Sequence, residues 1–352
     1  MMPSFWHKRR VLVTGHTGFK GSWLSLLLQQ LGAEVTGLAL APATTPALFD
    51  DAAVADGMES RIGNINDGDL VSQTLRESNP EIILHLAAQA IVSESYTQPL
   101  ETLQTNIMGT ARLLECARNQ PGIRAIVIVT TDKCYENREW LWGYRENDAL
   151  GGKDIYSSSK ACAELVTASY RHAFFDKPDS PVLATARAGN VIGGGDWATD
   201  RLLPDMVRAF TAGRPALIRS PSSVRPWQHV LEPLHGYLRL ARLCCEDRQF
   251  GRAWNFGPEL ADAAAVATVA DRVVNLWGEG AAWHAPAGNP LKESHTLRLD
   301  SSQARLQLNW QPRTGLDQAL ALTVAWYRGW AAGDDPAQLT RRQIAQYMAG
   351  HS

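Results

Sequence analysis

The chain has 352 residues, 45% of them hydrophobic and 20% charged, so it can bury a large core. Its 34 basic and 36 acidic residues nearly balance, which leaves no basic surplus for binding nucleic acid. Its apolar runs are too short for a membrane span, and its five cysteines, which form no CxxC pair, fit a reducing cytoplasm better than a disulfide or zinc framework.

Short apolar runs alternate with helical patterns through the first half of the chain. The expected strands are 10–15, 34–40, 59–65, 81–88 and 123–131. Three helices are expected between these strands. Leucines at helical spacing predict the first, which ends at Gly32; the second begins near Asp67, and the third runs from Pro99 to Cys116. This alternation predicts an α/β fold with a doubly wound parallel (Rossmann) sheet, which holds ligands outside the carboxyl ends of its strands.

Glycine, proline and tryptophan become frequent after about Arg187, and the alternation becomes less regular. Helices are expected over 231–245, 265–277 and 315–330. We interpret residues 1–187 as a dinucleotide-binding domain and 188–352 as a smaller substrate-binding lobe, with a return to the first domain near 224–258.

Three glycines, Gly15, Gly18 and Gly21, follow the first strand in "VLVTGHTGFKG". Without Cβ atoms they allow a tight turn, and they let a pyrophosphate approach backbone N–H groups at a helix N-terminus. The second strand ends "GLALAP", with neither the acid that usually bonds the ribose nor an arginine for a 2′-phosphate. The pattern predicts a dinucleotide site and favours NAD over NADP.

Tyr156 and Lys160 of "YSSSK" stand four residues apart and therefore share one helical face. A nearby ammonium stabilises a phenolate, so we expect Lys160 to lower the tyrosine pKa from its usual value of about 10. Tyr156 would then accept a proton from an alcohol while a hydride leaves for nicotinamide, and Lys160 would also hold the nicotinamide ribose.

The fifth strand ends "VTTDKCYE", which places Thr131, Asp132 and Lys133 at the edge where substrate should bind. Charged groups at a buried strand end cost free energy unless they are paired or used. A capped loop with a surface ion pair and a catalytic turn both fit this pattern.

Taken together, GxxGxxG, "HLAAQA", "TTDK", YxxxK and "RPWQHV" resemble the extended short-chain dehydrogenase/reductase family. Within it, the whole chain is similar to the nucleotide-sugar 4,6-dehydratases, and above all to those that act on CDP-glucose. The stretches "WLWGYREND" and "GNVIGGGDWATDRLLPD" carry this likeness more specifically than the general motifs do.

The resemblance implies a three-step reaction that starts deoxysugar synthesis, as for lipopolysaccharide O-antigen. NAD oxidises the sugar at C4, with Tyr156 as base and Thr131 bonded to the C4 oxygen. Water then leaves across C5 and C6, and the hydride returns to C6. Related dehydratases have an Asp–Glu pair after the threonine, so Asp132 is the expected acid. Lys133 stands in place of the glutamate; it is either the C5 base or a group that positions Asp132 or stabilises enolate charge.

The resemblance also implies binding residues and a partner. Asn190 and Arg225 match contacts with the substrate diphosphate, and helices near 100–116 and 157–174 are expected to pair two copies as a homodimer. His85 and His229 are interpreted as structural, and no metal site is expected. The positions that match cofactor contacts are Gly15, Thr17, Gly18, Phe19, Lys20, Gly21, Asn64, Ile65, Ala87, Ala88 and Gln89.

Two other functions remain open at this point. A nucleotide-sugar 4-epimerase or reductase would use the same fold, but it would need no acid beside Thr131 for a departing hydroxyl. A dinucleotide-sensing regulator would need no Tyr156/Lys160 pair. The preferred nucleobase follows from the resemblance alone.

Overall fold

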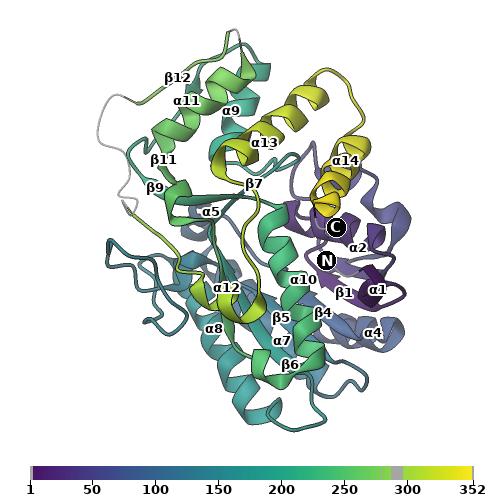
Figure 1. Cartoon of the computed structure of the whole chain (residues 1–352). Helices are drawn as coiled ribbons and strands as arrows, with labels where there is room; N and C mark the ends of the chain where they lie inside the picture. Colours follow the sequence, from purple (N-terminus) through teal and green to yellow (C-terminus); the bar gives the residue numbers. More distant parts are fainter. Residues whose placement is uncertain (1–2, 279, 287–295, 351–352) are drawn as a thin grey trace.

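The computed structural model describes residues 3–278, 280–286 and 296–350, and its largest sheet is parallel throughout (Figure 1). The strands run in the order β10-β6-β5-β4-β1-β2-β3. Their bounds are β1 Arg10–Thr14, β2 Glu34–Ala39, β3 Glu59–Ile62, β4 Ile82–His85, β5 Ala125–Val129, β6 Val182–Ala188 and β10 Ala253–Phe256. The strand order reverses between β1 and β4, the position where doubly wound sheets bind their ligands.

Helices cover both faces of this sheet, as the continuous apolar strands require. Val11 and Val13 of β1 face a core shared with α2 (Phe19–Gln30) and α10 (Leu231–Glu246). Leu12 faces a core shared with α4 (Gly68–Ser78) and α7 (Thr110–Arg118). The helical segments before β6 are α1 Pro3–Trp6, α2 Phe19–Gln30, α3 Leu48–Asp51, η1 Val54–Gly57, α4 Gly68–Ser78, α5 Val92–Thr97, α6 Pro99–Leu103, η2 Gln104–Gly109, α7 Thr110–Arg118, η3 Asp132–Cys134 and α8 Ile155–Phe174. The doubly wound fold is confirmed.

Residues after β6 build a second layer above the carboxyl ends of the strands and also return to the main sheet (Figure 1). Their segments are β7 Asn190–Ile192, α9 Leu202–Thr211, β8 Ala216–Leu217, β9 Val224–His229, α10 Leu231–Glu246, η4 Arg248–Phe250, η5 Leu260–Asp262, β11 Ala263–Ala265, α11 Val266–Trp277, β12 Trp283–His284, α12 Ser302–Leu308, α13 Leu316–Ala331 and α14 Pro336–Ala349. The division into domains at 187 stays a prediction.

One local expectation differs from the structure. The helix expected from Pro99 to Cys116 contains the π-helical segment η2 between α6 and α7. The helix expected over 265–277 is confirmed as α11, and Ala263–Ala265 just before it pairs as β11 with Val224, Arg225 and Pro226 of β9.

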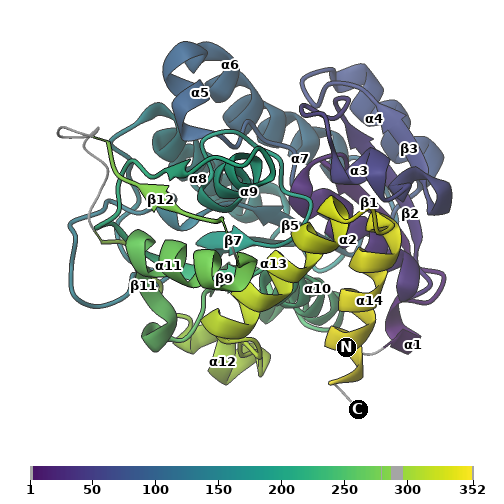
Figure 2. The ribbon, with the colours of Figure 1, turned by 90° about the horizontal axis from the view of Figure 1, so that it is seen from above.

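The C-terminal helix α14 packs between α13 and α2 (Figure 2). Trp326 of α13 donates its indole N–H to the hydroxyl of Thr340 on α14 at 2.9 Å. Gln30 at the end of α2 donates to the Arg341 carbonyl of α14 at 3.3 Å. These contacts fix α2, and with it the glycine turn that precedes it, from the side opposite to the sheet.

Candidate active site

The glycine turn occupies the point where the strand order reverses. Gly15 follows β1 with φ +75°, and a Cβ there would lie 2.7 Å from the backbone nitrogen of Ala87, beyond the end of β4. A Cβ on Gly21 would lie 2.0 Å from the Gly15 carbonyl oxygen. Gly18 is exposed, and a Cβ on it would make only an ordinary 3.5 Å contact within the chain. Gly15 and Gly21 allow the backbone segments to pack closely. Gly18 leaves room outside the turn for the phosphates of a ligand.

The residues between these glycines have different surroundings. The Thr17 hydroxyl donates to the Leu40 carbonyl at 2.8 Å, which ties the turn to the end of β2. Phe19 packs against the core shared with α2 and α10. The ammonium of Lys20 lies 6.0 Å from the centre of the Tyr237 ring on α10.

The end of β2 has a neutral histidine nearby instead of an acid. The His16 imidazole is fully buried, shares a 2.7 Å hydrogen bond with Ser60, and packs edge-on against Phe49. Burial lowers its pKa to about 4, although a backbone hydrogen bond with Leu38 opposes the shift. Sequence reasoning passed over this residue, because nothing in the spacing marks it.

The two residues assigned to the adenine-binding turn contribute differently. Asn64 is exposed, and its side-chain oxygen accepts from the Asn66 backbone N–H at 2.9 Å. Ile65 is only 5% exposed and packs in the core that includes residues of α4 and α7. Its side chain anchors the turn, so only its backbone is available to a ligand.

The segment after β4 is held by a buried asparagine of the π-helical segment. Asn106 accepts from the Gln89 backbone N–H at 2.9 Å and donates to its carbonyl at 3.0 Å. It also donates to Ser159 of α8 at 2.8 Å. Ala87, Ala88 and Gln89 are all partly buried beside the glycine turn, and this asparagine links them to the helix that carries Tyr156.

Tyr156 and Lys160 project from the first turns of α8 into the site and are 8% and 7% exposed. Asp154 caps this helix by accepting from the Ser157 backbone N–H at 2.8 Å. The Lys160 ammonium donates to the Val129 carbonyl at the end of β5, 3.4 Å away. The pair therefore shares one face, as expected, at the carboxyl edge of the sheet.

The electrostatics of this pair differ from the sequence-based expectation. Burial raises the pKa of Tyr156 to about 12, opposed by the charge of Arg201 and by a hydrogen bond with Thr131. Burial also lowers the pKa of Lys160 to about 8, with Glu164 opposing that shift. The expected lowering of the Tyr156 pKa is therefore wrong for the chain without ligand, and the cation that opposes the effect of burial is Arg201.

Thr131, Asp132 and Lys133 form a short turn directly after β5. Asp132 is fully buried, and its Oδ1 accepts from the Thr131 hydroxyl at 3.0 Å. The Lys133 ammonium, with a side chain 31% exposed, lies 3.7 Å from the same oxygen. The turn thus hydrogen-bonds one carboxylate oxygen and leaves the other, Oδ2, buried without a partner among the described residues.

A buried ion pair holds this turn at both ends. Glu164 of α8 accepts from the hydroxyl of Thr130, which precedes the turn, and from Arg187 at 2.8 Å. Arg187 also donates to the hydroxyl of Tyr135, which follows the turn, at 2.8 Å. Glu164 keeps a lowered pKa, because Arg187 and these hydrogen bonds outweigh the effect of its burial. The network joins the turn formed by Thr131, Asp132 and Lys133 to α8 and β6.

Asn190 and Arg225 come from the neighbouring strands β7 and β9 of the second layer. Asn190 follows β6, and its side-chain oxygen is buried without a partner among the described residues. Arg225 is 8% exposed, and one of its guanidinium N–H groups donates to the Val224 carbonyl at 3.0 Å. Asn190 pairs in register with Trp227, two residues beyond Arg225, so both lie in the same small sheet.

Arg201 is a site residue that sequence reasoning missed. It immediately precedes α9, forms a 2.9 Å ion pair with buried Asp196, and interacts electrostatically with Tyr156 and Lys20. Its only sequence signal is its place in the "GGGDWATDR" segment after β7.

The two histidines interpreted as structural are both buried. His85 lies 2.7 Å from the Thr14 hydroxyl and 3.2 Å from that of Thr110, and burial lowers its pKa to about 3. His229 packs edge-on against Trp23, and burial lowers its pKa to about 4. Within the described ranges, no cluster of His, Cys, Asp and Glu is arranged to hold a metal ion.

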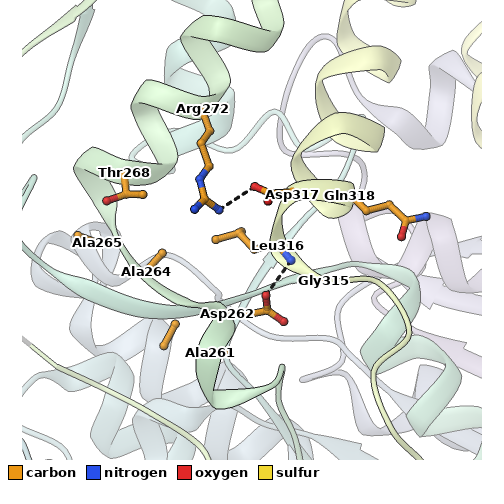
Figure 3. Close-up of a pocket in the computed structure, with 11 residues that line it drawn as sticks. Ala261, Asp262, Ala264, Ala265, Thr268, Arg272, Gly315, Leu316, Asp317 and Gln318 are labelled. Atoms are coloured by element: carbon orange, nitrogen blue, oxygen red, sulfur yellow. Dashed lines mark hydrogen bonds and ion pairs between the residues drawn. The ribbon is translucent and has the colours of Figure 1, made fainter.

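A hollow of about 670 Å³ lies elsewhere, between β11, α11 and α13 (Figure 3). Arg272 reaches across it to Asp317 at 2.8 Å, and Asp262 accepts from the Leu316 backbone N–H at the start of α13. None of the residues assigned to cofactor, catalysis or substrate lines this hollow.

A glycine turn at the strand reversal, a Tyr–Lys pair at the start of α8 and a Thr–Asp turn after β5 define an extended short-chain dehydrogenase/reductase. Residues 12–243 match the family model described as GDP-mannose 4,6 dehydratase, and the chain belongs to that family.

Among curated proteins, the chain is 50% identical to the CDP-glucose 4,6-dehydratase of Salmonella typhimurium (strain LT2), in an alignment 351 residues long that covers 98% of each chain. It is 26% identical to the dTDP-glucose 4,6-dehydratase of Xanthomonas campestris pv. campestris (strain B100), over 90% of this chain and 92% of that one. The solved dTDP-glucose 4,6-dehydratase of Bacillus anthracis in complex with NAD superposes with a TM-score of 0.76 at 21% identity, over 93% and 99% of the two chains.

Proposed function

We propose that the protein is an NAD-dependent CDP-glucose 4,6-dehydratase, which converts CDP-glucose to CDP-4-keto-6-deoxyglucose and water. The 50% identity to the Salmonella enzyme over nearly the full length of both chains carries this proposal. The buried Thr131–Asp132 turn beside Tyr156 supports it, because an elimination needs an acid in addition to the groups that oxidise C4.

The residues present fit a dinucleotide. The backbones of the glycine turn and the Ala87 segment approach so closely that side chains are excluded, and the exposed Gly18 stands at the N-terminus of α2, where backbone N–H groups can meet a diphosphate. Gly18, Phe19 and Lys20 would hold the diphosphate, and Asn64 with the Ile65 backbone would hold the adenine. When bound, NAD supplies the hydride acceptor for C4 and returns that hydride to C6.

Tyr156 would take the proton of the C4 hydroxyl during oxidation. Its raised pKa means that the phenolate needs stabilisation at the moment of transfer. Arg201 and the hydrogen bond with Thr131 both lower that pKa, and the Thr131 hydroxyl also has Asp132 as an acceptor at 3.0 Å. Thr131 can therefore alternate between two acceptors, the carboxylate and the phenolate.

Asp132 would give a proton to the C6 hydroxyl as it leaves. Its Oδ1 is held by Thr131 and faces Lys133, whereas Oδ2 is the oxygen without a partner among the described residues. A rigidly placed carboxyl with one available oxygen suits general acid catalysis.

Lys133→Met tests whether the lysine that replaces the usual glutamate is a base. Because its ammonium lies 3.7 Å from Asp132, we expect Lys133 to position that carboxyl instead of taking the C5 proton. The variant should lose roughly tenfold in kcat, within the range for a misplaced catalytic group, and it should still exchange solvent deuterium at C5, as mass spectrometry of the sugar would show. A far larger loss, partly restored by Lys133→Glu, would instead identify Lys133 as the base.

The substrate assignment predicts that CDP-glucose is turned over faster than UDP-, GDP- or dTDP-glucose. Each sugar nucleotide is incubated with the protein, and the loss of one water is followed by mass spectrometry. Turnover of dTDP-glucose without turnover of CDP-glucose would contradict the assignment. Interconversion with a 4-epimer without loss of water would favour the epimerase alternative, and tight NAD binding without turnover of any sugar would favour a regulator.

We also propose a homodimer that pairs through α6, η2, α7 and α8. Four apolar side chains on these segments are 41–79% exposed: Leu100 on α6, Met108 on η2, and Leu165 and Phe174 on α8. They form an apolar surface that a second copy would cover.

All five cysteines are free thiols, which supports a location in a reducing cytoplasm. The product would there enter deoxysugar synthesis such as that of O-antigen. Among the described residues, no helix has the length and apolar character needed to cross a bilayer.

A further inference from the structure

The carboxylate of Glu164 is buried one helical turn beyond Lys160 on α8. Its residue is 3% exposed, and the spacing of four places both side chains on one face of the helix. Its Oε1 accepts from the Thr130 hydroxyl, and its Oε2 accepts from the hydroxyl of Thr185 at 2.7 Å and from Arg187 at 2.8 Å. Both oxygens are therefore engaged by the chain itself, so this group can orient its partners.

The same face of α8 holds two consecutive residues at the end of β5. The Lys160 ammonium donates to the Val129 carbonyl at 3.4 Å, and Glu164 accepts from the hydroxyl of Thr130, the next residue. Thr131 follows directly, so the turn that it begins leaves the strand at a point that the two α8 side chains fix together. A displacement of that turn by about 1 Å would be enough to slow a reaction by up to about a hundredfold.

Glu164 is also the main counter-charge of Lys160. Three titratable groups on other elements face this ammonium, namely Lys20 of α2, His85 of β4 and Cys134 of η3. Lys20 carries the same charge, and burial leaves the other two neutral, because it lowers the pKa of His85 to about 3 and raises the pKa of the Cys134 thiol. Burial lowers the pKa of Lys160 to about 8, and Glu164 opposes that shift most among the described residues.

We propose that Glu164 is a positioning residue of the active site. Its carboxylate holds the turn after β5 against the helix that carries Tyr156, and its charge keeps the Lys160 ammonium protonated. The inference rests on the proposed function and goes beyond it, because the Tyr–Lys pair and the Thr–Asp turn were assigned their roles without this residue. A residue that only stabilised the fold would leave the pH dependence of turnover unchanged.

Two threonines test the positioning role, because both donate to this carboxylate and only one adjoins the turn. Thr130→Val and Thr185→Val each remove one buried hydroxyl and keep a β-branched side chain of similar shape. At pH 7, Thr130→Val should lower kcat for CDP-glucose by about tenfold to a hundredfold, with KM changed by less than about twofold. Thr185→Val, on β6, is the matched control and should leave both constants unchanged.

The pH profile of kcat tests the charge of Glu164. Lys160 is charged below its pKa of about 8, so turnover by the unmodified protein should decline above that pH. Glu164→Gln keeps the length of the side chain and removes its charge, so the decline should move down by about one pH unit or more. Glu164→Asp keeps the charge and should keep the decline in place, although its shorter side chain should lower kcat. Glu115→Gln, at the surface ion pair with Arg118, should leave the whole profile unchanged.

Equal kcat values in Thr130→Val and Thr185→Val, or an unshifted profile in Glu164→Gln, would overturn the inference. A thermal unfolding curve of each variant shows whether a lost rate reflects unfolding. If Glu164→Gln does not fold, the threonine pair decides, since a loss confined to Thr130→Val supports the inference and equal rates contradict it. Failure of the unmodified protein to remove water from CDP-glucose would instead overturn the proposed function.

Discussion

Tyr156→Phe is expected to lower the turnover of CDP-glucose by about 10²–10⁴-fold while the sugar nucleotide still binds. The phenylalanine ring fills the same buried space, so α8 should keep its packing. The variant lacks only the hydroxyl, which is the group that meets Thr131 and accepts the proton of the C4 hydroxyl. Steady-state rates measure the loss, and calorimetry with CDP-glucose shows whether binding persists.

The same helix offers a matched control. Tyr170 lies toward the other end of α8, and its hydroxyl donates to Glu115 at 3.3 Å, away from the site. Tyr170→Phe should therefore turn over CDP-glucose at the unmodified rate. If Tyr156→Phe also keeps a near-native rate, the Tyr156–Lys160 pair is a structural feature of α8 and another group removes the C4 proton.

Much of the sheet could be predicted because its signals are local. A buried parallel strand is a continuous β-branched run, as in 125–129, and each such run is followed by a helical pattern. The glycine turn was also recognisable, since backbone crowding between Gly21 and Gly15 leaves no side-chain alternative. Tyr156 and Lys160 share a face by helix periodicity alone, and the structure places them so.

Long-range contacts could not be predicted in the same way. Glu164 and Arg187 look in the sequence like ordinary charges on a helix and a strand, yet they form a buried pair at 2.8 Å that holds both ends of the Thr131 turn. Arg201 reaches Tyr156 only because α9 returns over the sheet. The direction of the Tyr156 pKa shift depends on how deeply the phenol is buried, which spacing does not reveal.

Asp132→Asn is expected to separate oxidation from elimination. Asparagine matches aspartate in size, which matters because Asp132 is fully buried. Its amide can still accept from Thr131, but it is a far poorer proton donor than a carboxyl group. Oxidation at C4 depends on Tyr156 and Thr131, so it should proceed, whereas loss of the C6 hydroxyl should slow by about 10²–10⁴-fold.

Enzyme-bound NADH should therefore accumulate after this variant is mixed with CDP-glucose, and stopped-flow absorbance of reduced nicotinamide would detect it. Asp176→Asn, an exchange at an exposed loop position, should show no such accumulation. Loss of turnover without NADH would place Asp132 in the oxidation step or in folding, which a thermal unfolding curve distinguishes. Unchanged turnover would mean that another residue protonates the departing hydroxyl, because no amide could replace the buried carboxyl in that step.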